Sequence, residues 1–564
     1  MAETYDFVIV GSGPAGSAIA AWLAKSAKKP KVLLVEAGGK NDDKDLRVDG
    51  QRWLTFQNPH MNWGYKTTPQ EHCCGRELDY SRGLGLGGSS AVNFSVWTVG
   101  ASHDYDEWAR IVGDEFFSWP HMQRRFKSLE AFDPTLPPGI DSKYAAPKAE
   151  NHGSSGPLRT GYVAEVERDL VPMMKLFEES GYPLSPDPNS GNPIGLSLGI
   201  NSSSKGVRST ATDLFTPVPE NLTIVTDSPI HRIILEGKKA VGVESNGKRY
   251  FASKEVILSG GSINNPKILM HSGIGPKAQL EKFGIPVVQD IPCIGSGLRD
   301  HMFVPVVYAR PKGETDRPGF YGNKQAMADA LGQWKIDGTG PWATFSCEMP
   351  IGWFKLDQLP TTREFQELPE EEKQFLNHPT VPHYELVSHF PAHWFMPDLV
   401  DTALDYSCFL VFLYNAQSRG TIGLASADPN AAPAVDPEFL STPFDRRAAI
   451  GALRDANRIM RYEPFARNNV STVAGPVGDS DEDLLDYWRK NISSSWHMTG
   501  TVKMGPAGAA DAAVDKDFRL VGLENLRVAD MSVVPVLASC HVQAVAYLTG
   551  ITCAEKLIAE YDLA

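Results

Sequence analysis

Cysteine is scarce in this sequence, and its spacing excludes two classes of site. Only 7 of the 564 residues are cysteines, an odd number that includes no Cys-x-x-Cys pair. A disulfide framework or a zinc site would need paired or closely spaced cysteines, so neither is expected. Cys73 and Cys74 are adjacent in the chain and could not easily bridge each other. We therefore expect no metal centre.

Positive charge is also in short supply. The chain has 54 Lys and Arg residues against 68 Asp and Glu residues, which gives a formal charge of -14. This balance argues against nucleic acid or an anionic membrane surface as the main partner, because both attract basic proteins. A hydrophobic content of 42% with 22% charged residues is ordinary for a folded protein. A small molecule is the partner that fits best.

The sequence has no room for a signal peptide before its first strand-like run, which begins at Tyr5. As given, the chain is expected to be cytoplasmic, or secreted if a signal peptide was removed. One stretch, residues 531–554, carries no charge and is long enough to span a bilayer. It also contains His541 and Gln543, which are costly in lipid, so a buried segment of a protein core is predicted and no membrane partner is expected.

The chain begins with the pattern of a dinucleotide-binding unit. A strand-like run, "YDFVIV", is followed by a glycine loop, by the helix-like "SAIAAWLAKSAKKP" and by a second strand-like run, "KVLLVEAG". Gly11, Gly13 and Gly16 form the spacing GxGxxG, which predicts a pyrophosphate on the helix N-terminus. Glu36 ends the second strand, where a carboxylate can accept hydrogen bonds from a ribose and would repel the phosphorylated ribose of NADP. These residues alone do not separate NAD from FAD.

The length of the chain predicts more than one domain. Short β-rich runs recur at 221–261, and a strand, a loop and a long helix are predicted at 524–561. The stretches between are richer in Pro, Trp and Phe. The first domain is therefore predicted to comprise 1–154, 203–309 and 520–564, and an interleaved second domain to comprise 155–202 and 310–519.

A second glycine-rich stretch, "SRGLGLGGSSAVNFSVW", spans 81–97. Its glycines let the backbone approach a flat ligand, and its hydroxyl and amide side chains offer hydrogen bonds. With this stretch included, the sequence resembles the glucose-methanol-choline (GMC) oxidoreductases, FAD enzymes that oxidise alcohols. The resemblance covers essentially the whole chain and rests on six motifs in the right order: "VGSGPAG", "VEAG", "GLGLGGSSAVN", "GGSINNPKILMHSGIGP", "SRGTIGLASADP" and the C-terminal pair "WHMTGTVKMGP" and "LRVADMSVVP". Asn265 stands where the fourth motif usually has Ser or Thr.

The resemblance implies an α/β fold, α+β overall, in which a Rossmann-like FAD-binding domain is joined to a substrate-binding domain built on an antiparallel sheet. Some relatives attach the flavin covalently through a histidine just before the motif asparagine. Here that position is Val92, so non-covalent FAD is expected. The neighbours of the cofactor implied by the resemblance are Gly83, Gly88, Ser89, Asn93, Ile230 (through its backbone, beside the adenine), Asp530 and Val542.

His497 and His541 stand where this family carries its catalytic pair. Oxidising an alcohol needs a base for the hydroxyl proton while hydride leaves the carbon for flavin N5, and a neutral imidazole suits that task. We assign this role to His497, with His541 as the hydrogen-bond partner of the hydroxyl oxygen. Either histidine alone would more often be a structural residue. A histidine at 541 points to the two-histidine subgroup that includes glucose oxidase and aryl-alcohol oxidases, and away from the formate-oxidising type.

The substrate is predicted from what surrounds His497. Glucose-specific members carry Arg and Asn four and two residues before this histidine, whereas Ser493 and Ser495 stand here. Glucose is therefore less favoured. Aromatic side chains that can stack on an aryl substrate are Trp496, Phe390, Trp394 and Phe395, although they can equally fill a core.

An FAD-dependent oxidation of a primary alcohol, aryl or furanic, is the function predicted from the sequence, with O2 or a quinone as the electron acceptor. Two alternatives stay open: a sugar oxidase or dehydrogenase of the glucose type, and a hydroxynitrile lyase of the same fold that uses a histidine base without net redox. The motifs do not separate oxidase from dehydrogenase, and the oligomeric state is not predicted.

Overall fold

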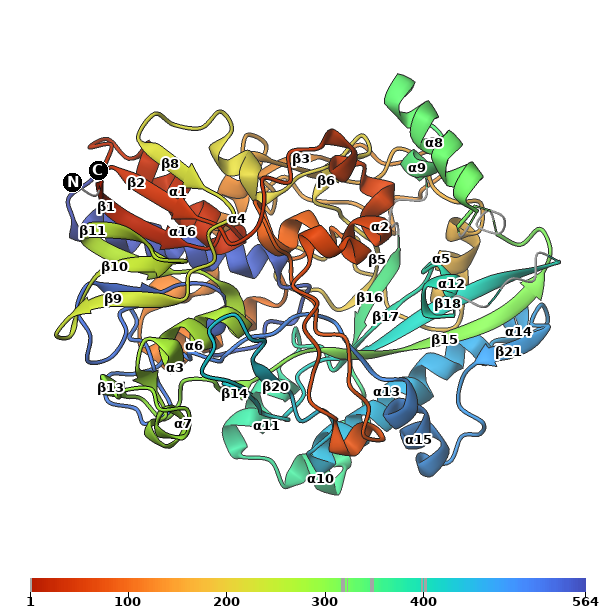
Figure 1. Cartoon of the computed structure of the whole chain (residues 1–564). Helices are drawn as coiled ribbons and strands as arrows, with labels where there is room; N and C mark the ends of the chain where they lie inside the picture. Colours follow the sequence, from red (N-terminus) through yellow and green to blue (C-terminus); the bar gives the residue numbers. More distant parts are fainter. Residues whose placement is uncertain (1–2, 316–319, 322, 345–348, 397–398, 400–402) are drawn as a thin grey trace.

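Two large sheets lie side by side in the protein, with the chain termini close together at the outer side of one of them (Figure 1). The structure is a computed structural model that describes residues 3–315, 320–321, 323–344, 349–396, 399 and 403–564. The sheet near the termini is mostly parallel, and the second sheet is antiparallel.

The first sheet has the order β8, β2, β1, β11, β10, β9, with β23 paired to β11. Its strands are β1 (Thr4–Val10), β2 (Val32–Val35), β8 (Leu222–Val225), β9 (Arg232–Glu236), β10 (Lys239–Ser245), β11 (Lys248–Leu258) and β23 (Leu526–Val528). β1 is parallel to both β2 and β11, whereas β10 is antiparallel to β9 and β11. β1 and β2 read as nearly continuous apolar runs because parallel strands are buried on both faces.

The predicted strand-helix-strand unit at the N-terminus is confirmed, with different helix bounds. Helix α1 runs over Pro14–Lys25, so it begins before the predicted Ser17 and ends well before Pro30. Proline is suited to the first turn because that position needs no backbone N–H. At the other end, Ser26 adopts an extended backbone conformation with φ of -65° and ψ of 156°, which ends the helix after Lys25.

The second sheet has the order β21, β15, β18, β17, β16, β5, with β22 paired to β15. Its strands are β5 (Gly195–Leu198), β15 (Met302–Pro311), β16 (Pro350–Phe354), β17 (Tyr384–Val387), β18 (Leu404–Leu413), β21 (Ser471–Ala474) and β22 (Ser493–Ser494). Side chains alternate between its two faces. On β18, Phe409 and Val411 join the core with helix α13 (Pro443–Arg461), while Leu410 and Phe412 face a cavity.

Helices cover the outer faces of both sheets. Helix α16 (Gln543–Glu560) packs on α1, and the fit is close: a Cβ on Gly550 would lie 2.3 Å from the carbonyl oxygen of Ala15. α15 (Asp481–Asn491) packs on β15. The other principal helices are α2 (Arg52–Gln57), α3 (Ser102–Val112), α4 (Trp119–Leu129), α5 (Leu170–Glu179), α6 (Gly261–His271), α7 (Lys277–Lys282), α8 (Lys324–Asp337), α11 (Glu370–Asn377) and α12 (Ala392–Phe395).

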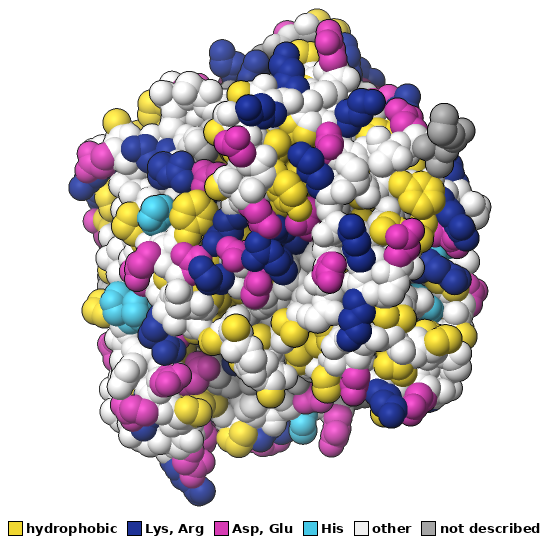
Figure 2. Space-filling view, turned by 90° about the vertical axis from the view of Figure 1, so that its left-hand side faces the viewer, with side chains coloured by type: hydrophobic (Ala, Val, Ile, Leu, Met, Phe, Trp, Pro, Cys, Tyr) yellow, Lys and Arg dark blue, Asp and Glu magenta, His cyan; other side chains and the backbone are white. Residues whose placement is uncertain are grey.

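The uncharged stretch at 531–554 forms part of the core. It contains the turn at Met531–Val533 and most of α16, and nearly all of its side chains are buried. Among the helices that the structure describes, none is long and apolar enough to cross a membrane. On the face beside the termini, Lys and Arg side chains lie interspersed with Asp and Glu (Figure 2).

The mixed helix and sheet architecture agrees with the predicted fold class. The strands of the parallel sheet come from residues 4–258 and 526–528, and those of the antiparallel sheet from 195–198 and 302–494. The division into two interleaved domains at the stated bounds stays a prediction.

Candidate active site

A single cavity between the two sheets brings together nearly all the residues predicted to act. It is lined by the predicted histidines, His497 and His541, and by the predicted substrate contacts, Trp496, Phe390, Trp394 and Phe395. The predicted cofactor contacts that line it are Gly11, Gly13, Glu36, Gly83, Gly88, Ser89, Asn93, Ile230, Asp530 and Val542. Gly16 does not line it.

The glycine loop between β1 and α1 forms the floor of one end of the cavity. Gly11 has a φ of 94°, and a Cβ on it would lie 2.4 Å from the carbonyl oxygen of Ser259. A Cβ on Gly16 would lie 1.9 Å from the carbonyl oxygen of Gly11, so Gly16 keeps the helix against the loop. A Cβ on Gly13 would meet no atom within 4 Å. The backbone at Gly13 is therefore open to the cavity, as a bound pyrophosphate requires.

Glu36 directly follows β2 and already accepts hydrogen bonds from several protein donors. Its Oε2 accepts from the backbone N–H of Ser12 at 2.9 Å and from the Ser12 hydroxyl at 2.7 Å. Its Oε1 accepts from the backbone N–H groups of Gly38 and Gly85, each at 3.0 Å. A carboxylate offers about four acceptor positions. A ribose hydroxyl at Glu36 would therefore replace the hydrogen bond from the Ser12 hydroxyl, which can rotate away.

Asp530 and Asn265 form a polar pair beside the glycine loop. Asp530 Oδ2 accepts from Asn265 Nδ2 at 2.8 Å and from the backbone N–H of Gly261 at 2.6 Å. Asn265 Oδ1 also accepts from the backbone N–H of Gly260 at 2.8 Å. An amide can donate two hydrogen bonds while its oxygen accepts, whereas a hydroxyl has only one proton to donate. Asn265, which stands where the motif usually has Ser or Thr, therefore joins Asp530 to the start of α6.

His497 follows the end of β22 by three residues and is hydrogen-bonded through one ring nitrogen. Its Nδ1 is 3.2 Å from the Ser495 hydroxyl and 3.0 Å from His301 Nδ1. The Ser495 hydroxyl itself donates to the carbonyl oxygen of His301 at 2.8 Å. The hydroxyl proton is thus used, so the Ser495 oxygen can accept from His497 in the tautomer that carries its proton on Nδ1. The lone pair of the neutral ring is then on Nε2, which leaves that atom able to accept a proton.

The environment of His497 keeps its imidazole neutral. Burial lowers the pKa of His497 well below its usual 6.5, and the positive charge that His541 can carry, His301 and the Arg82 guanidinium lower it further. Burial also lowers the pKa of His301. A base must be unprotonated before it can accept a proton, so His497 is in the right state at neutral pH.

His541 faces His497 and is held by a carboxylate of the antiparallel sheet. The two imidazole rings are 4.9 Å apart at an interplanar angle of 79°. His541 Nε2 lies 2.9 Å from Glu385 Oε1, and the Tyr414 hydroxyl donates to Glu385 Oε2 at 2.6 Å. Glu385 is fully buried on β17. The carboxylate thus fixes the ring orientation of His541 and leaves Nδ1 as its other hydrogen-bonding atom.

An aromatic wall encloses the part of the cavity beside the two histidines. Trp53 of α2 packs on Trp394 with ring centroids 4.3 Å apart and on Phe94 at 4.5 Å. The ring centroids of Phe412 on β18 and His541 are 5.7 Å apart. The aromatic residues of this wall that line the cavity are Trp53, Phe56, Phe94, Phe303, Phe390, Trp394, Phe395, Phe412 and Trp496.

Trp496 is held in this wall by a strained backbone. Its φ of 60° is unusual for a bulky residue. Arg82 donates to its carbonyl oxygen at 2.6 Å, the Ser494 hydroxyl accepts from its backbone N–H at 2.8 Å, and Asp79 accepts from its indole N–H at 3.0 Å. Strain of this kind persists only where the surroundings over-determine it and is common at functional sites.

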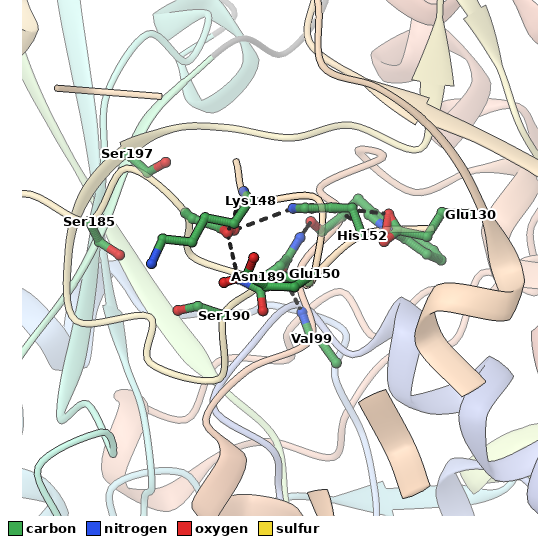
Figure 3. Close-up of polar contacts among 12 residues, drawn as sticks. Val99, Glu130, Lys148, Glu150, His152, Ser185, Asn189, Ser190 and Ser197 are labelled. Carbon is green, nitrogen blue, oxygen red and sulfur yellow. Dashed lines mark hydrogen bonds and ion pairs between the residues drawn. The ribbon is translucent and has the colours of Figure 1, made fainter. Parts of the chain in front are cut away.

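A buried polar cluster around His152 and Asn189 lies beside the chain at Val99 (Figure 3). His152 lies between two carboxylates, with Nδ1 3.2 Å from Glu130 and Nε2 3.3 Å from Asp187. Asn189 accepts from the backbone N–H of Val99 at 2.9 Å. The adjacent Thr98 hydroxyl accepts from the backbone N–H of His541 at 3.3 Å. The cluster therefore anchors the segment that contacts the His541 backbone.

Replacing His152 by leucine is expected to cost about 3–5 kcal/mol of unfolding free energy, because two buried carboxylates would lose their partner. Burial alone would lower the pKa of His152, but hydrogen bonds to Asp187 and Glu130 raise it from 6.5 to about 9. The stabilisation from the charged ring is thus complete below pH 6.5 and lost as pH rises through about 9. Urea unfolding of both proteins at several pH values measures this, with the exposed His60→Leu as control. If the difference in unfolding free energy between the natural protein and His152→Leu does not become smaller above pH 9, His152 is not charged.

Sequence reasoning missed several residues of this site. Glu385 is a single acidic residue in the apolar run "HYELV", and a lone acid in a buried strand is a usable signal. His301, in "GLRDHM", gave no such signal. Trp53, Phe56 and Phe94 were missed because they come from segments far from either histidine in the sequence.

Comparison with known proteins finds matches along most of the chain. Two family models described as GMC oxidoreductase match residues 5–303 and 416–550. Among curated proteins, an oxygen-dependent choline dehydrogenase of Chromohalobacter salexigens is 30% identical, covering 99% of this chain and 95% of its own. A pyranose dehydrogenase of Agaricus campestris is 30% identical, covering 96% and 91%.

Solved structures give the same fold over the whole chain. A formate oxidase variant of Aspergillus oryzae is 26% identical with a TM-score of 0.88, and a fungal aryl-alcohol oxidase is 24% identical with a TM-score of 0.84. In both cases the match covers 100% of each chain. At 24% identity the second likeness supports the fold alone.

Proposed function

This chain is a member of the GMC oxidoreductase family, and we propose that it oxidises a primary alcohol, aryl or furanic, to the aldehyde. The enzymes of this family use FAD and act on alcohol-type donors. The observation that carries the proposed substrate class is the aromatic wall beside His497 and His541.

The residues of the cavity fit FAD. The open backbone at Gly13 can receive a pyrophosphate, Glu36 can accept from a ribose hydroxyl, and the cavity continues to the two histidines. Val92 lines the cavity at the position where some relatives attach the flavin through a histidine. A valine side chain has no nucleophile for that bond, so the proposed FAD is held non-covalently.

The two histidines are proposed to divide the proton chemistry of alcohol oxidation. FAD, when bound, supplies the two-electron acceptor. His497 Nε2 takes the hydroxyl proton, because its lone pair is free and its ring is neutral. His541 Nδ1, when protonated, donates to the oxygen on which negative charge develops, and Glu385 balances the charge of that ring.

The walls of the cavity favour an aromatic substrate over a sugar. Indole and phenyl rings stack on aryl groups, with preferred centroid separations of about 4.5–7 Å. A sugar has several hydroxyl groups, and each would need a hydrogen-bonding partner once buried. Polar side chains that line the cavity near His497, such as Ser495 and Asn93, already bond within the protein.

A quaternary ammonium alcohol is the second candidate. Trp53, Trp394 and Phe94 are within 6.4 Å of one another by ring centroids, and such aromatic groupings attract organic cations. Relatives at 30% identity over nearly the whole chain are named choline dehydrogenases.

An anaerobic screen of flavin reduction tests the substrate class. Aryl, furanic, aliphatic, quaternary ammonium and sugar alcohols are mixed with the protein without an acceptor, and loss of flavin absorbance is followed. Aryl or furanic alcohols are expected to give kcat/KM at least about tenfold above the others, since one well-packed ring is worth more than 1.4 kcal/mol. Preference for a sugar or a quaternary ammonium alcohol would overturn the aryl assignment, and no reduction by any alcohol would favour the lyase. Mixing the reduced protein with O2 or benzoquinone then identifies the acceptor.

A further inference from the structure

Three basic side chains line the cavity on the side of α6, and the alcohol chemistry does not use them. His231 precedes β9, and Lys267 and His271 are one turn apart on α6, so they share a face of that helix. The Ser272 hydroxyl, just after α6, accepts from the backbone N–H of Ile233 at 2.9 Å. This bond joins the end of α6 to the start of β9.

Two of these groups present hydrogen-bond donors that have no acceptor among the described residues. Lys267 is 9% exposed, and its ammonium makes no hydrogen bond or ion pair with the part of the chain that the structure describes. His231 Nε2 is buried without a hydrogen-bond partner among the described residues, and the Asn430 side chain lies close enough to influence the ring. An unsatisfied buried donor costs free energy, more so when it is charged. Both groups line the cavity, so a ligand there can supply the missing acceptors.

The charges around these donors disfavour a phosphate group. Burial, followed by the charge of Lys267, lowers the pKa of His271 to about 4 and also lowers that of His231. Both imidazoles are therefore uncharged at neutral pH. The carboxylate of Asp428 is close enough to influence all three groups. His271 is in the last turn of α6, where the helix dipole repels anions.

An uncharged ligand with several lone pairs fits this environment better than an anion. Glu36 lies in the same cavity as Ile230 and His231, and its backbone carbonyl accepts from the N–H of Ser228 at 2.9 Å, which brings that segment beside it. Ile230 and Ile268 line the cavity there and offer apolar surface to a flat ring. A purine presents such a ring with unprotonated nitrogens along its edges.

We propose that Lys267 and His231 donate hydrogen bonds to ring nitrogens of the FAD adenine, with His271 beside them. The inference deepens the proposed function, since it rests on FAD as the cofactor. It makes Lys267 the residue that recognises the base at the end of the cavity away from the reacting alcohol.

Binding of FAD to the full-length protein tests this. After FAD has been removed, its dissociation constant is measured by flavin fluorescence for the natural protein and for Lys267→Met. The substitution keeps the length of the side chain and removes the donor, so FAD is expected to bind about 10- to 100-fold more weakly. Lys277→Met is the matched control, because Lys277 is exposed on α7 and is expected to leave the affinity unchanged.

FAD analogues identify the atom that is contacted. In each analogue, one ring nitrogen of the adenine is replaced by CH. The natural protein should lose affinity for an analogue that lacks a contacted nitrogen, and Lys267→Met should bind FAD and the analogue that lacks the nitrogen contacted by Lys267 equally well. Equal affinity of both proteins for FAD, or of the natural protein for every analogue, would overturn the proposal. A failure of the proposed function would appear differently, as FAD that binds but is not reduced by any alcohol.

Discussion

Replacing His497 by alanine is expected to slow flavin reduction by alcohol about 10²–10⁴-fold, the contribution of a positioned general base. Nε2 is the atom proposed to accept the hydroxyl proton, in the tautomer whose Nδ1 proton is donated to the Ser495 hydroxyl oxygen. The cofactor should stay bound, since the glycine loop and Glu36 belong to other segments. Anaerobic stopped-flow measurement of flavin absorbance gives both the rate and the bound fraction.

Imidazole added to His497→Ala provides the control for this experiment. A free base that fits the vacated space should restore part of the rate if proton acceptance is what was lost. His60→Ala, on the surface, should reduce at the natural rate. Reduction of His497→Ala at near the natural rate would show that another group is the base.

The pH dependence of the same step follows from the buried state of His497. Its pKa lies well below 6.5, mainly because of burial. The base is protonated, and the rate lost, only as pH falls through that lowered pKa. Flavin reduction should therefore hold its rate down to pH values below 6.5. A rate that stays constant between neutral pH and pH values below 6.5 would support His497 as the base. A rate that falls with an apparent pKa near 6.5 would argue against that role.

Sequence patterns predicted those residues of the site that lie together in one short segment of the chain. Gly11, Gly13 and Glu36 belong to one strand-helix-strand unit, whose apolar runs and glycine spacing can be recognised within about 30 residues. The two histidines were found differently, through the resemblance to a family. Neither has a local pattern that marks it as catalytic.

Contacts between segments that are far apart in the chain could not be predicted from the sequence. Glu385 meets His541 across 156 positions, and His301 meets His497 across 196. Trp53 reaches Trp394 only because α2 lies against α12. Such contacts are set by how the antiparallel sheet packs on the dinucleotide unit, and no periodicity in either segment encodes that packing.

The order of the antiparallel sheet explains why these residues converge. β17 carries Glu385, and its neighbour β18 carries Phe412, so the sheet presents a carboxylate and an aromatic ring to the same imidazole. The parallel sheet and its loops carry most of the residues proposed to contact the cofactor. The proposed reaction therefore takes place where one sheet supplies the cofactor site and the other supplies the partners of His541.

Removing His541 is expected to have the second largest effect. His541→Ala should lower kcat for flavin reduction about 10²–10³-fold, the cost of losing one donor to a developing negative charge. His541→Asn keeps an amide donor and should lose less. KM for the alcohol should change less than kcat, because the bond strengthens as the proton leaves. A variant that loses affinity alone would make His541 a simple binding residue.

Glu385 tests whether the carboxylate acts through His541. Glu385→Gln keeps the side-chain shape but loses the charge that balances a protonated His541, so kcat should fall by about tenfold or more. Since Glu385 works through the histidine, Glu385→Gln combined with His541→Ala should be no slower than His541→Ala alone. Tyr414→Phe removes only the 2.6 Å bond to the other carboxylate oxygen and should have a smaller effect. Fully additive losses in the double variant would mean that Glu385 acts on the substrate or the cofactor independently of His541.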